Sequence, residues 1–141
     1  RERQAKAQAE NVSVLGEVPK ALPALDAAFK IQARAARVGF DWPDAKPVYG
    51  TLEEETAELR EAAAEGDKAE MEEEFGDLLF SCVNLARKLD INPTQALQLA
   101  NIKFRRRFEH MEQSIKQNSQ NIEDLSLEEL EDRWIAAKSE S

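Results

Sequence analysis

The feature that most limits how this chain can fold is a short, strongly acidic window at residues 51–77. Twelve residues of the window are Asp or Glu and only Arg60 and Lys68 oppose them, so its net charge is −10. The rest of the 141-residue chain carries a net charge of +1. Carboxylates at this density repel one another unless water or bound cations surround them. The acids of the window therefore form solvated helix faces, a cation site or both.

Helix-forming residues dominate the chain as a whole. Ala and Leu total 35 residues, whereas Val, Ile and Thr total 15 and nowhere alternate with polar residues over the length of a strand. We therefore predict an all-α fold, a helical bundle of about five helices. We expect the first helix to have Pro19 in its first turn and to end at Gly39, before an ordered loop at residues 39–50. Capping boxes predict three further helix starts, at Thr51 with Glu54, at Asp67 with Glu70 and at Ser126 with Glu129. Gly66 predicts the end of the second helix, and Asn92 precedes a helix that starts at Pro93.

An apolar stripe on the third predicted helix indicates a buried bundle core. Its members recur at steps of three and four residues: Met71, Phe75, Leu78, Cys82, Leu85 and Leu89. Cys82 is the only cysteine, so it excludes a disulfide framework and a cysteine zinc site. We expect Cys82 to be a buried thiol in a reducing compartment, which favours a cytoplasmic location.

The length predicts one domain, at residues 15–141, after a connector or frayed N-terminus at residues 1–14. Because the chain begins at Arg1 and not at Met, we expect it to be a piece of something longer. No apolar run approaches the about 20 residues of a membrane span, and the first ten residues lack the apolar core of a signal peptide. The net charge of −9 disfavours a nucleic-acid-binding surface. We therefore expect neither a membrane nor a nucleic acid as a partner.

Two pairs of acids within the window are candidates for a metal site. Glu55 and Glu58 are spaced i, i+3 on the second predicted helix. Glu74 and Asp77 have the same spacing on the third. Because a turn at Gly66 joins the two helices, they run antiparallel and the four carboxylates can converge. Ligation by oxygen alone suits Mg²⁺ or Mn²⁺, whereas Zn²⁺ favours His or Cys.

The alternative is that these acids are merely solvated, as acidic helix faces often are. Asp77 argues against that, because an uncommitted position in the middle of a helix is more often Glu, Lys or Gln. Ser81 and Asn84 also continue the polar stripe of Glu74 and Asp77, which indicates a lined cleft. We assign the solvated role to the other glutamates of the window: Glu53, Glu61, Glu65, Glu70 and Glu72.

A basic patch lies on the fourth predicted helix, where Lys103, Arg106 and Arg107 share one face. Such a patch can hold phosphates, or it can simply neutralise the acidic helices. Together with metal-binding acids it supplies both halves of a magnesium–polyphosphate site. Trp134, with Lys138 one turn later, can stack on a base or can anchor a core.

The segments LEEETAEL and EEEFGDLLF resemble the Glu-x-x-Glu and Glu-x-x-Asp signature of the MazG family of all-α nucleoside triphosphate pyrophosphohydrolases. The segments KALPALDAAFKIQARAARVGFDW, VNLARKL and ANIKFRRRFEHME are similar to the second of two tandem domains in bacterial MazG. The resemblance covers most of residues 15–138. It implies a homodimer that uses Mg²⁺ to hydrolyse nucleoside triphosphates to the monophosphate and pyrophosphate by attack of water at the α-phosphate.

The resemblance also implies roles for individual residues. The metal ligands and catalytic acids would be Glu55, Glu58, Glu74 and Asp77, one of which, or a neighbour, would activate the water. Substrate would be bound by Lys103 and Arg107 at the triphosphate and by Trp134 and Lys138 at the nucleotide. The polar stripe adds Asn84 as a further candidate for substrate binding. Two alternatives stay open: a non-catalytic dimerisation or interaction domain of a longer enzyme, and a narrower dUTP or dCTP pyrophosphatase.

Overall fold

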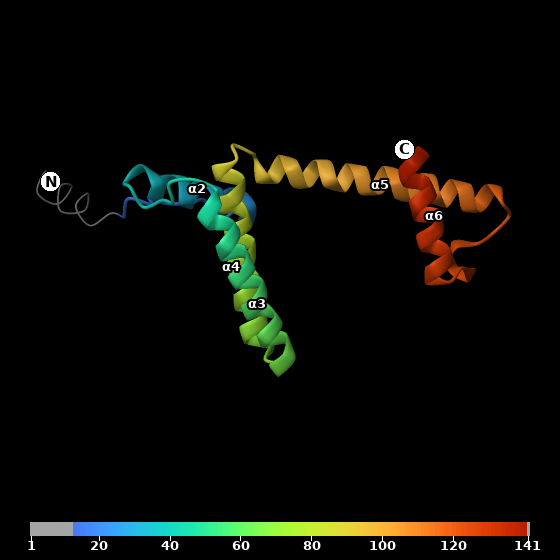
Figure 1. The fold of residues 1–141 in the computed structure, drawn as a ribbon. Helices are drawn as coiled ribbons and strands as arrows, with labels where there is room; N and C mark the ends of the chain where they lie inside the picture. Colours follow the sequence, from blue (N-terminus) through green and yellow to red (C-terminus); the bar gives the residue numbers. More distant parts are fainter. Residues whose placement is uncertain (1–12, 141) are drawn as a thin grey trace, which may run out of the picture. The chain divides into compact units, whose positions relative to one another are not determined.

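The computed structural model describes residues 13–140, and every regular element within this range is helical, which confirms the all-α prediction (Figure 1). The chain divides into two compact units, one ending at Thr94 and the other beginning at Gln95. The elements are α2 (Ala24–Arg37), α3 (Lys46–Glu65), α4 (Lys68–Lys88), α5 (Pro93–Gln117), the short 3₁₀ helix η1 (Ile122–Asp124) and α6 (Leu127–Glu140). None of the helices among the described residues is both long enough and apolar enough to cross a membrane. Most of the predicted connector at residues 1–14 lies outside the described residues.

The first unit is built on α3 and α4, which run antiparallel and side by side (Figure 1). Gly66 ends α3 in the left-handed conformation, with φ of 75°, which glycine adopts without a steric cost. Asp67 begins α4, because its carboxylate accepts a hydrogen bond of 3.2 Å from the backbone N–H of Glu70. The sequence predicts both the helix end at Gly66 and the helix start at Asp67. The helix α2 packs against α4.

Two predicted helix starts are wrong. The first helix begins at Ala24 and not near Pro19, which instead accepts a turn hydrogen bond of 3.1 Å from the N–H of Leu22. The second begins at Lys46 and not at Thr51, so the predicted loop is shorter than residues 39–50. Proline is tolerated in a first helical turn, and Pro47 therefore lies inside α3.

The prediction that the apolar stripe of α4 is buried in a core is also wrong for the chain by itself. Val83 is buried, together with Val48 and Ala62 of α3, but Phe75 is 50% exposed and Cys82 is exposed. The reason is that α4 turns a different face, which includes the polar residues Ser81 and Asn84, toward the interior of the unit. Phe75, Cys82 and Leu89 of the apolar stripe are therefore exposed on the first unit, whereas Met71, Leu78 and Leu85 are half-buried.

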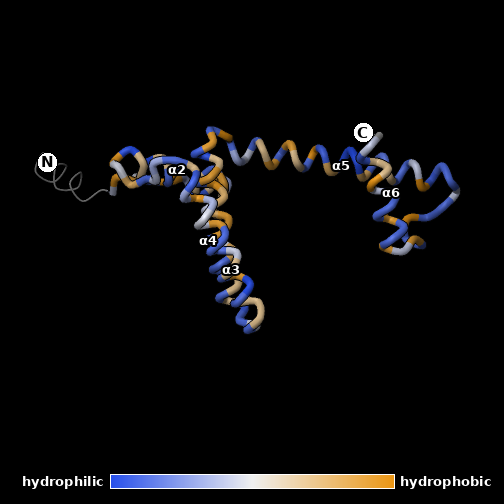
Figure 2. The backbone as a smooth tube through the Cα atoms, in the orientation of Figure 1, coloured by the Kyte–Doolittle hydropathy of each residue, from blue (hydrophilic) through white to orange (hydrophobic). Residues whose placement is uncertain are grey.

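The second unit consists of α5 from Gln95 onward, η1 and α6. Its core is formed by Met111, Ile115 and Ala137, and the partly buried residues that pack on this core are Phe108, Ile122, Leu125, Leu130 and Trp134. Figure 2 shows how orange hydrophobic and blue hydrophilic residues alternate along α5, as expected for a helix with one apolar face.

The predicted capping box at the start of α6 is confirmed. The Ser126 hydroxyl accepts from the N–H of Glu129 at 3.2 Å, and the Glu129 carboxylate accepts from the N–H of Ser126 at 3.3 Å. The last predicted helix boundary therefore follows from two local hydrogen bonds.

The cap at Asp67 gives a test of this fold. We expect Asp67→Ala to lower the free energy of unfolding by about 1 kcal/mol, because the N–H of Glu70 loses its acceptor. Urea denaturation followed by circular dichroism measures the change. Asp67→Asn is the matched control, since Asn caps as well as Asp. Equal loss in both variants would contradict the assigned role of this side chain.

Candidate metal centre and adjoining cavity

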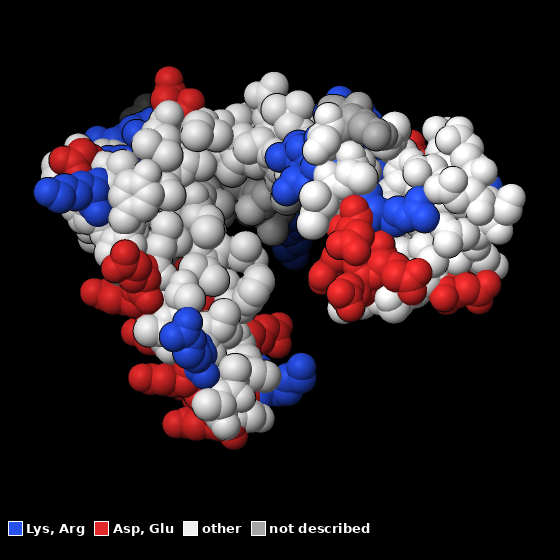
Figure 3. Space-filling view, turned by 45° about the vertical axis from the view of Figure 1, so that its right-hand side comes forward, with Lys and Arg blue, Asp and Glu red and all other residues white. Residues whose placement is uncertain are grey.

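The pairing of α3 with α4 brings three glutamates together. Glu55, Glu58 and Glu74 each place one carboxylate oxygen so that the three oxygens lie within 4.8 Å of one another. Figure 3 shows acidic side chains gathered over the arm formed by these two helices. The two acids spaced i, i+3 on α3 therefore meet one acid of the pair on α4, as the sequence predicts.

We call Glu55, Glu58 and Glu74 the acidic cluster. The pKa values of its members indicate that their carboxylates repel one another. A hydrogen bond that protonated Glu74 can share with Glu58 raises the pKa of Glu74 to about 7, with further upward contributions from burial and from neighbouring carboxylates. Burial, followed by the charges of Glu58 and Asp77, raises the pKa of Glu55. Protonation of Glu55 and Glu74 is thus favoured, because burial and the neighbouring carboxylates disfavour their charged forms.

The acidic cluster fits a bound divalent cation. The Oε2 atoms of Glu55 and Glu74 are buried and have no hydrogen-bond partner when the carboxylates are ionised. Buried acceptors without partners are costly, and a cation would satisfy both of them. Three carboxylate oxygens without His or Cys form a donor set that suits a hard cation such as Mg²⁺ or Mn²⁺.

The structure does not place the fourth predicted acid within this group. Asp77 is exposed and one turn along α4 from Glu74, but its charge contributes to the raised pKa values of Glu55 and Glu74. Its carboxylate is therefore close enough to interact with the acidic cluster electrostatically.

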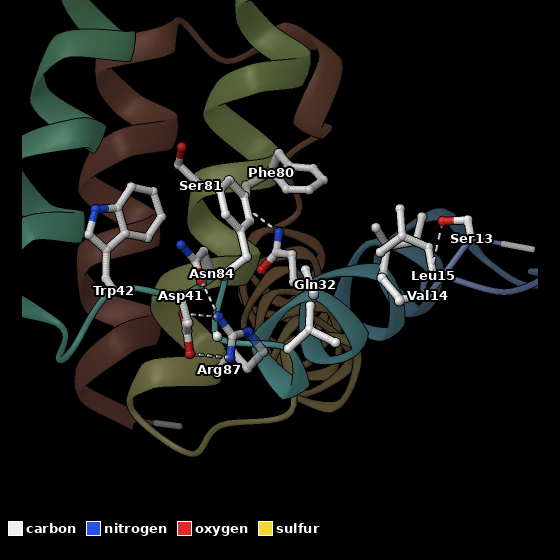
Figure 4. A pocket seen from close by; sticks show the side chains of 15 residues that line it. Ser13, Val14, Leu15, Gln32, Asp41, Trp42, Phe80, Ser81, Asn84 and Arg87 are labelled. Atoms are coloured by element: carbon white, nitrogen blue, oxygen red, sulfur yellow. Dashed lines mark hydrogen bonds and ion pairs between the residues drawn. The ribbon is translucent and has the colours of Figure 1, made fainter. Parts of the chain in front are cut away.

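A cavity of about 760 Å³ is lined in part by α4, beginning about two turns after Glu74 (Figure 4). Ser81 and Asn84, which continue the polar stripe, line it, as the predicted cleft requires. Its remaining walls come from residues 13–15, from α2, from the loop after α2 and from Phe80 and Arg87 of α4. They are largely apolar or aromatic: Val14, Leu15, Ile31, Phe40, Trp42 and Phe80.

A network of charges holds the loop after α2 against α4. The guanidinium of Arg87 donates two hydrogen bonds to the carboxylate of Asp41, at 2.6 and 3.1 Å, and Lys88 forms a second ion pair with it at 2.6 Å. The Lys88 ammonium also donates to the backbone carbonyl of Trp42. The hydrogen bond from Arg87, supported by that from Lys88, holds the pKa of Asp41 far below its ordinary value. These bonds anchor Trp42 beside the cavity.

Three polar or charged residues of this cavity, Gln32, Asp41 and Arg87, were not predicted from the sequence. Gln32 was hidden in an otherwise apolar helical face, and its polarity there was the one available signal. Asp41 and Arg87 were overlooked because they are 46 residues apart, and no local pattern pairs residues at that separation.

The remaining predicted substrate residues belong to the second unit. Lys103 and Lys138 are exposed, and the buried Nε of Arg107 has no hydrogen-bond partner. Trp134 packs against Phe104, with ring centroids 5.3 Å apart, and joins the core of that unit. Two roles were considered for Trp134, stacking on a base and anchoring a core. In the second unit by itself, Trp134 anchors the core.

Comparison with known proteins gives consistent matches. Residues 46–112 match the MazG nucleotide pyrophosphohydrolase domain. The chain is 48% identical over 126 residues to the nucleoside triphosphate pyrophosphohydrolase/pyrophosphatase MazG of Thermotoga maritima, covering 89% of this chain and 48% of that protein. It is 43% identical over 135 residues to the nucleoside triphosphate pyrophosphohydrolase of Escherichia coli K12, covering 94% of this chain and 51% of that protein. The chain thus spans about half the length of these curated relatives.

Thermal unfolding tests the metal centre. We expect Mg²⁺ or Mn²⁺ to raise the Tm of the chain by several degrees, because a cation that binds only the folded state stabilises it. Glu74→Gln should abolish this shift and should raise the Tm without metal, since it removes one like charge from the acidic cluster.

Glu72→Gln is the matched control, because Glu72 is an exposed acid on the same helix. This control should retain the full metal-dependent shift. A shift of the same size in Glu74→Gln would show that the cation binds elsewhere.

The ion pairs of Asp41 predict how stability depends on pH. Because folding lowers the pKa of Asp41 below its ordinary 3.8, the stabilisation is complete above that value and is lost as the pH falls through and below it. Asp41→Asn should therefore be less stable than the wild type by about 1 kcal/mol at pH 7, and the difference should shrink toward pH 3. Urea denaturation at pH 7, 5 and 3 measures it. Glu53→Gln, at an exposed acid of α3, is the control, and a pH-independent deficit in Asp41→Asn would refute the ion-pair explanation.

Proposed function

Because this chain carries a MazG nucleotide pyrophosphohydrolase domain, we propose that it hydrolyses nucleoside triphosphates to the nucleoside monophosphate and pyrophosphate, with Mg²⁺ as the cofactor and Mn²⁺ as a possible substitute. The observation that carries the proposal is the convergence of Glu55, Glu58 and Glu74 within 4.8 Å, with buried oxygens that lack partners. The names of the relatives from Thermotoga maritima and Escherichia coli support the same reaction.

In this proposal Glu55, Glu58, Glu74 and Asp77 hold the cation. When bound, the cation compensates negative charge on the phosphate oxygens and makes water more acidic. A carboxylate of this set or a neighbouring acid accepts a proton from the water that attacks the α-phosphorus. The new bond joins the water oxygen to the α-phosphorus, and the bond to the oxygen that bridges the α- and β-phosphates breaks, so that pyrophosphate leaves with the bonding electrons.

Cationic and aromatic residues complete the proposed substrate site. Lys103 and Arg107 bind the triphosphate, since Lys and Arg are the side chains that hold phosphate oxygens in line for attack. Trp134 and Lys138 bind elsewhere on the nucleotide, together with Asn84. These assignments rest on the resemblance of the residues to the family signature.

We also propose that the enzyme is a homodimer, in the cytoplasm, with no membrane or nucleic acid as a partner. The support for the dimer is the apolar surface that each unit leaves open. On α4 of the first unit, Phe75 and Leu79 are each at least 45% exposed, and on α5 of the second unit Ile102 and Phe104 are about 60% exposed. Exposed apolar residues grouped in this way mark surfaces that another chain covers.

Product analysis tests the reaction. We expect a panel of ribo- and deoxyribonucleoside triphosphates to give equal amounts of monophosphate and pyrophosphate with Mg²⁺, and neither product with EDTA, as measured by ion-exchange chromatography. Glu58→Gln and Asp77→Asn should each lower kcat by about 100-fold or more.

Glu61→Gln, at an exposed acid one turn after Glu58, should keep normal turnover. Release of orthophosphate and a diphosphate would mean that another bond is cut. Absence of turnover with every triphosphate would favour a non-catalytic interaction domain.

A further inference from the structure

We propose that Gln32 and Asn84 together read the edge of the nucleobase, Gln32 as the hydrogen-bond acceptor and Asn84 as the donor, in the cavity beside Trp42. The inference rests on the proposed function, because it assigns the cavity to the base of the triphosphate substrate. Both side chains come from the first unit, Gln32 from α2 and Asn84 from α4 (Figure 4).

Gln32 presents a free acceptor whose orientation is set by the backbone. The side chain is 7% exposed, and its Nε2 donates a hydrogen bond of 2.9 Å to the carbonyl oxygen of Phe80. A carbonyl only accepts, so the amide cannot be reversed. Its Oε1 is thereby left buried without a partner in a side chain that lines the cavity. Buried polar atoms without a partner are rare in folded proteins, and a ligand that donates a hydrogen bond would satisfy this one.

Asn84 presents the complementary group. The side chain is 6% exposed, and its Oδ1 accepts a hydrogen bond of 2.8 Å from Nη2 of Arg87. A guanidinium has no acceptor, so this amide cannot be reversed either. The amide N–H groups of Asn84 therefore point away from Arg87 and are available to an acceptor in the cavity. Arg87 itself is held by Asp41, which makes both of them positioning residues for Asn84.

The walls of the cavity favour a flat ligand with a polar edge. Trp42 and Phe80 contribute aromatic rings, and apolar side chains form most of the rest of the lining. Aromatic rings stack on the faces of nucleobases of any sequence. A nucleobase combines such a face with an edge that carries a hydrogen-bond donor beside an acceptor, as adenine does with its 6-amino group and a ring nitrogen.

The location along α4 agrees with this assignment. Asp77 and Asn84 lie on one face of the helix, two turns apart, which is about 10 Å of helix rise. A nucleotide whose base occupies the cavity would thus extend along the same helix face toward the acidic cluster. Because every common base offers an adjacent donor and acceptor, this recognition accepts several bases and rejects analogues without the donor.

The test compares ATP with purine riboside triphosphate, which has hydrogen in place of the 6-amino group. We expect the wild type to favour ATP by about 10-fold or more in kcat/KM, because the analogue leaves Oε1 of Gln32 unpaired. Gln32→Met, which removes the acceptor and keeps the size, should raise KM for ATP, leave kcat nearly unchanged and abolish the preference. Retained turnover of the analogue shows that this variant is folded. Gln113→Met, at an exposed glutamine of α5, is the control and should behave as the wild type.

A second measurement separates this inference from the proposed reaction. Calorimetric titration with AMP and with purine riboside monophosphate needs no turnover. The wild type should bind AMP more tightly, and Gln32→Met should not discriminate. Arg87→Met should instead weaken the binding of both monophosphates to a similar extent, because both retain the ring nitrogen that Asn84 would contact. A wild type that hydrolyses ATP but binds both monophosphates equally would overturn the base-edge assignment and leave the reaction intact. A Gln32→Met variant that keeps the preference would overturn it as well.

Discussion

The packing of α3 against α4 is the interaction on which the rest of the structure depends. It holds together the carboxylates of the acidic cluster, whose mutual repulsion would otherwise separate them. Burial of Val48, Ala62 and Val83 accompanies the pairing and stabilises it through the removal of apolar surface from water. This arrangement disfavours the charged form of Glu74, whose pKa is raised to about 7. A folded scaffold that forces carboxylates to this degree of proximity is prepared for a cation before the cation arrives, so the ligands need little reorganisation on binding.

The cavity is organised by a different kind of interaction. The loop after α2 is attached to α4 through the ion pairs that Asp41 forms with Arg87 and Lys88. Arg87 donates hydrogen bonds to both Asp41 and Asn84. One guanidinium therefore fixes both the position of the loop and the orientation of the Asn84 amide in the cavity. The acidic cluster is therefore held together by helix packing and the loop beside the cavity is held by charged hydrogen bonds, although α4 contributes to both.

Much of the fold was legible in the sequence wherever the decisive interaction is local. The caps at Asp67 and Ser126 and the stop at Gly66 involve residues within four positions of one another, and all three were predicted correctly. The start of α3 was misjudged because Pro47 fits a first turn as well as a loop. The apolar stripe of α4 was placed in a core because periodicity identifies an amphipathic helix but not what covers it. The convergence of Glu55, Glu58 and Glu74 followed from spacing and the turn, whereas Gln32 depends on Phe80, 48 residues away.

The brevity of the connection at Gly66 and Asp67 has a consequence for how chains of this kind can diverge. Only these two residues separate α3 from α4, so the connection has little slack to absorb a change in length. Deleting or inserting one residue between Glu58 and Gly66 would turn the preceding part of α3 by about 100° and shift it by about 1.5 Å relative to α4. That rotation would carry Glu55 and Glu58 away from Glu74. We therefore expect insertions and deletions in homologous chains to accumulate in the loop after α2 and around η1, while the interval from Glu58 to Glu74 keeps a constant length.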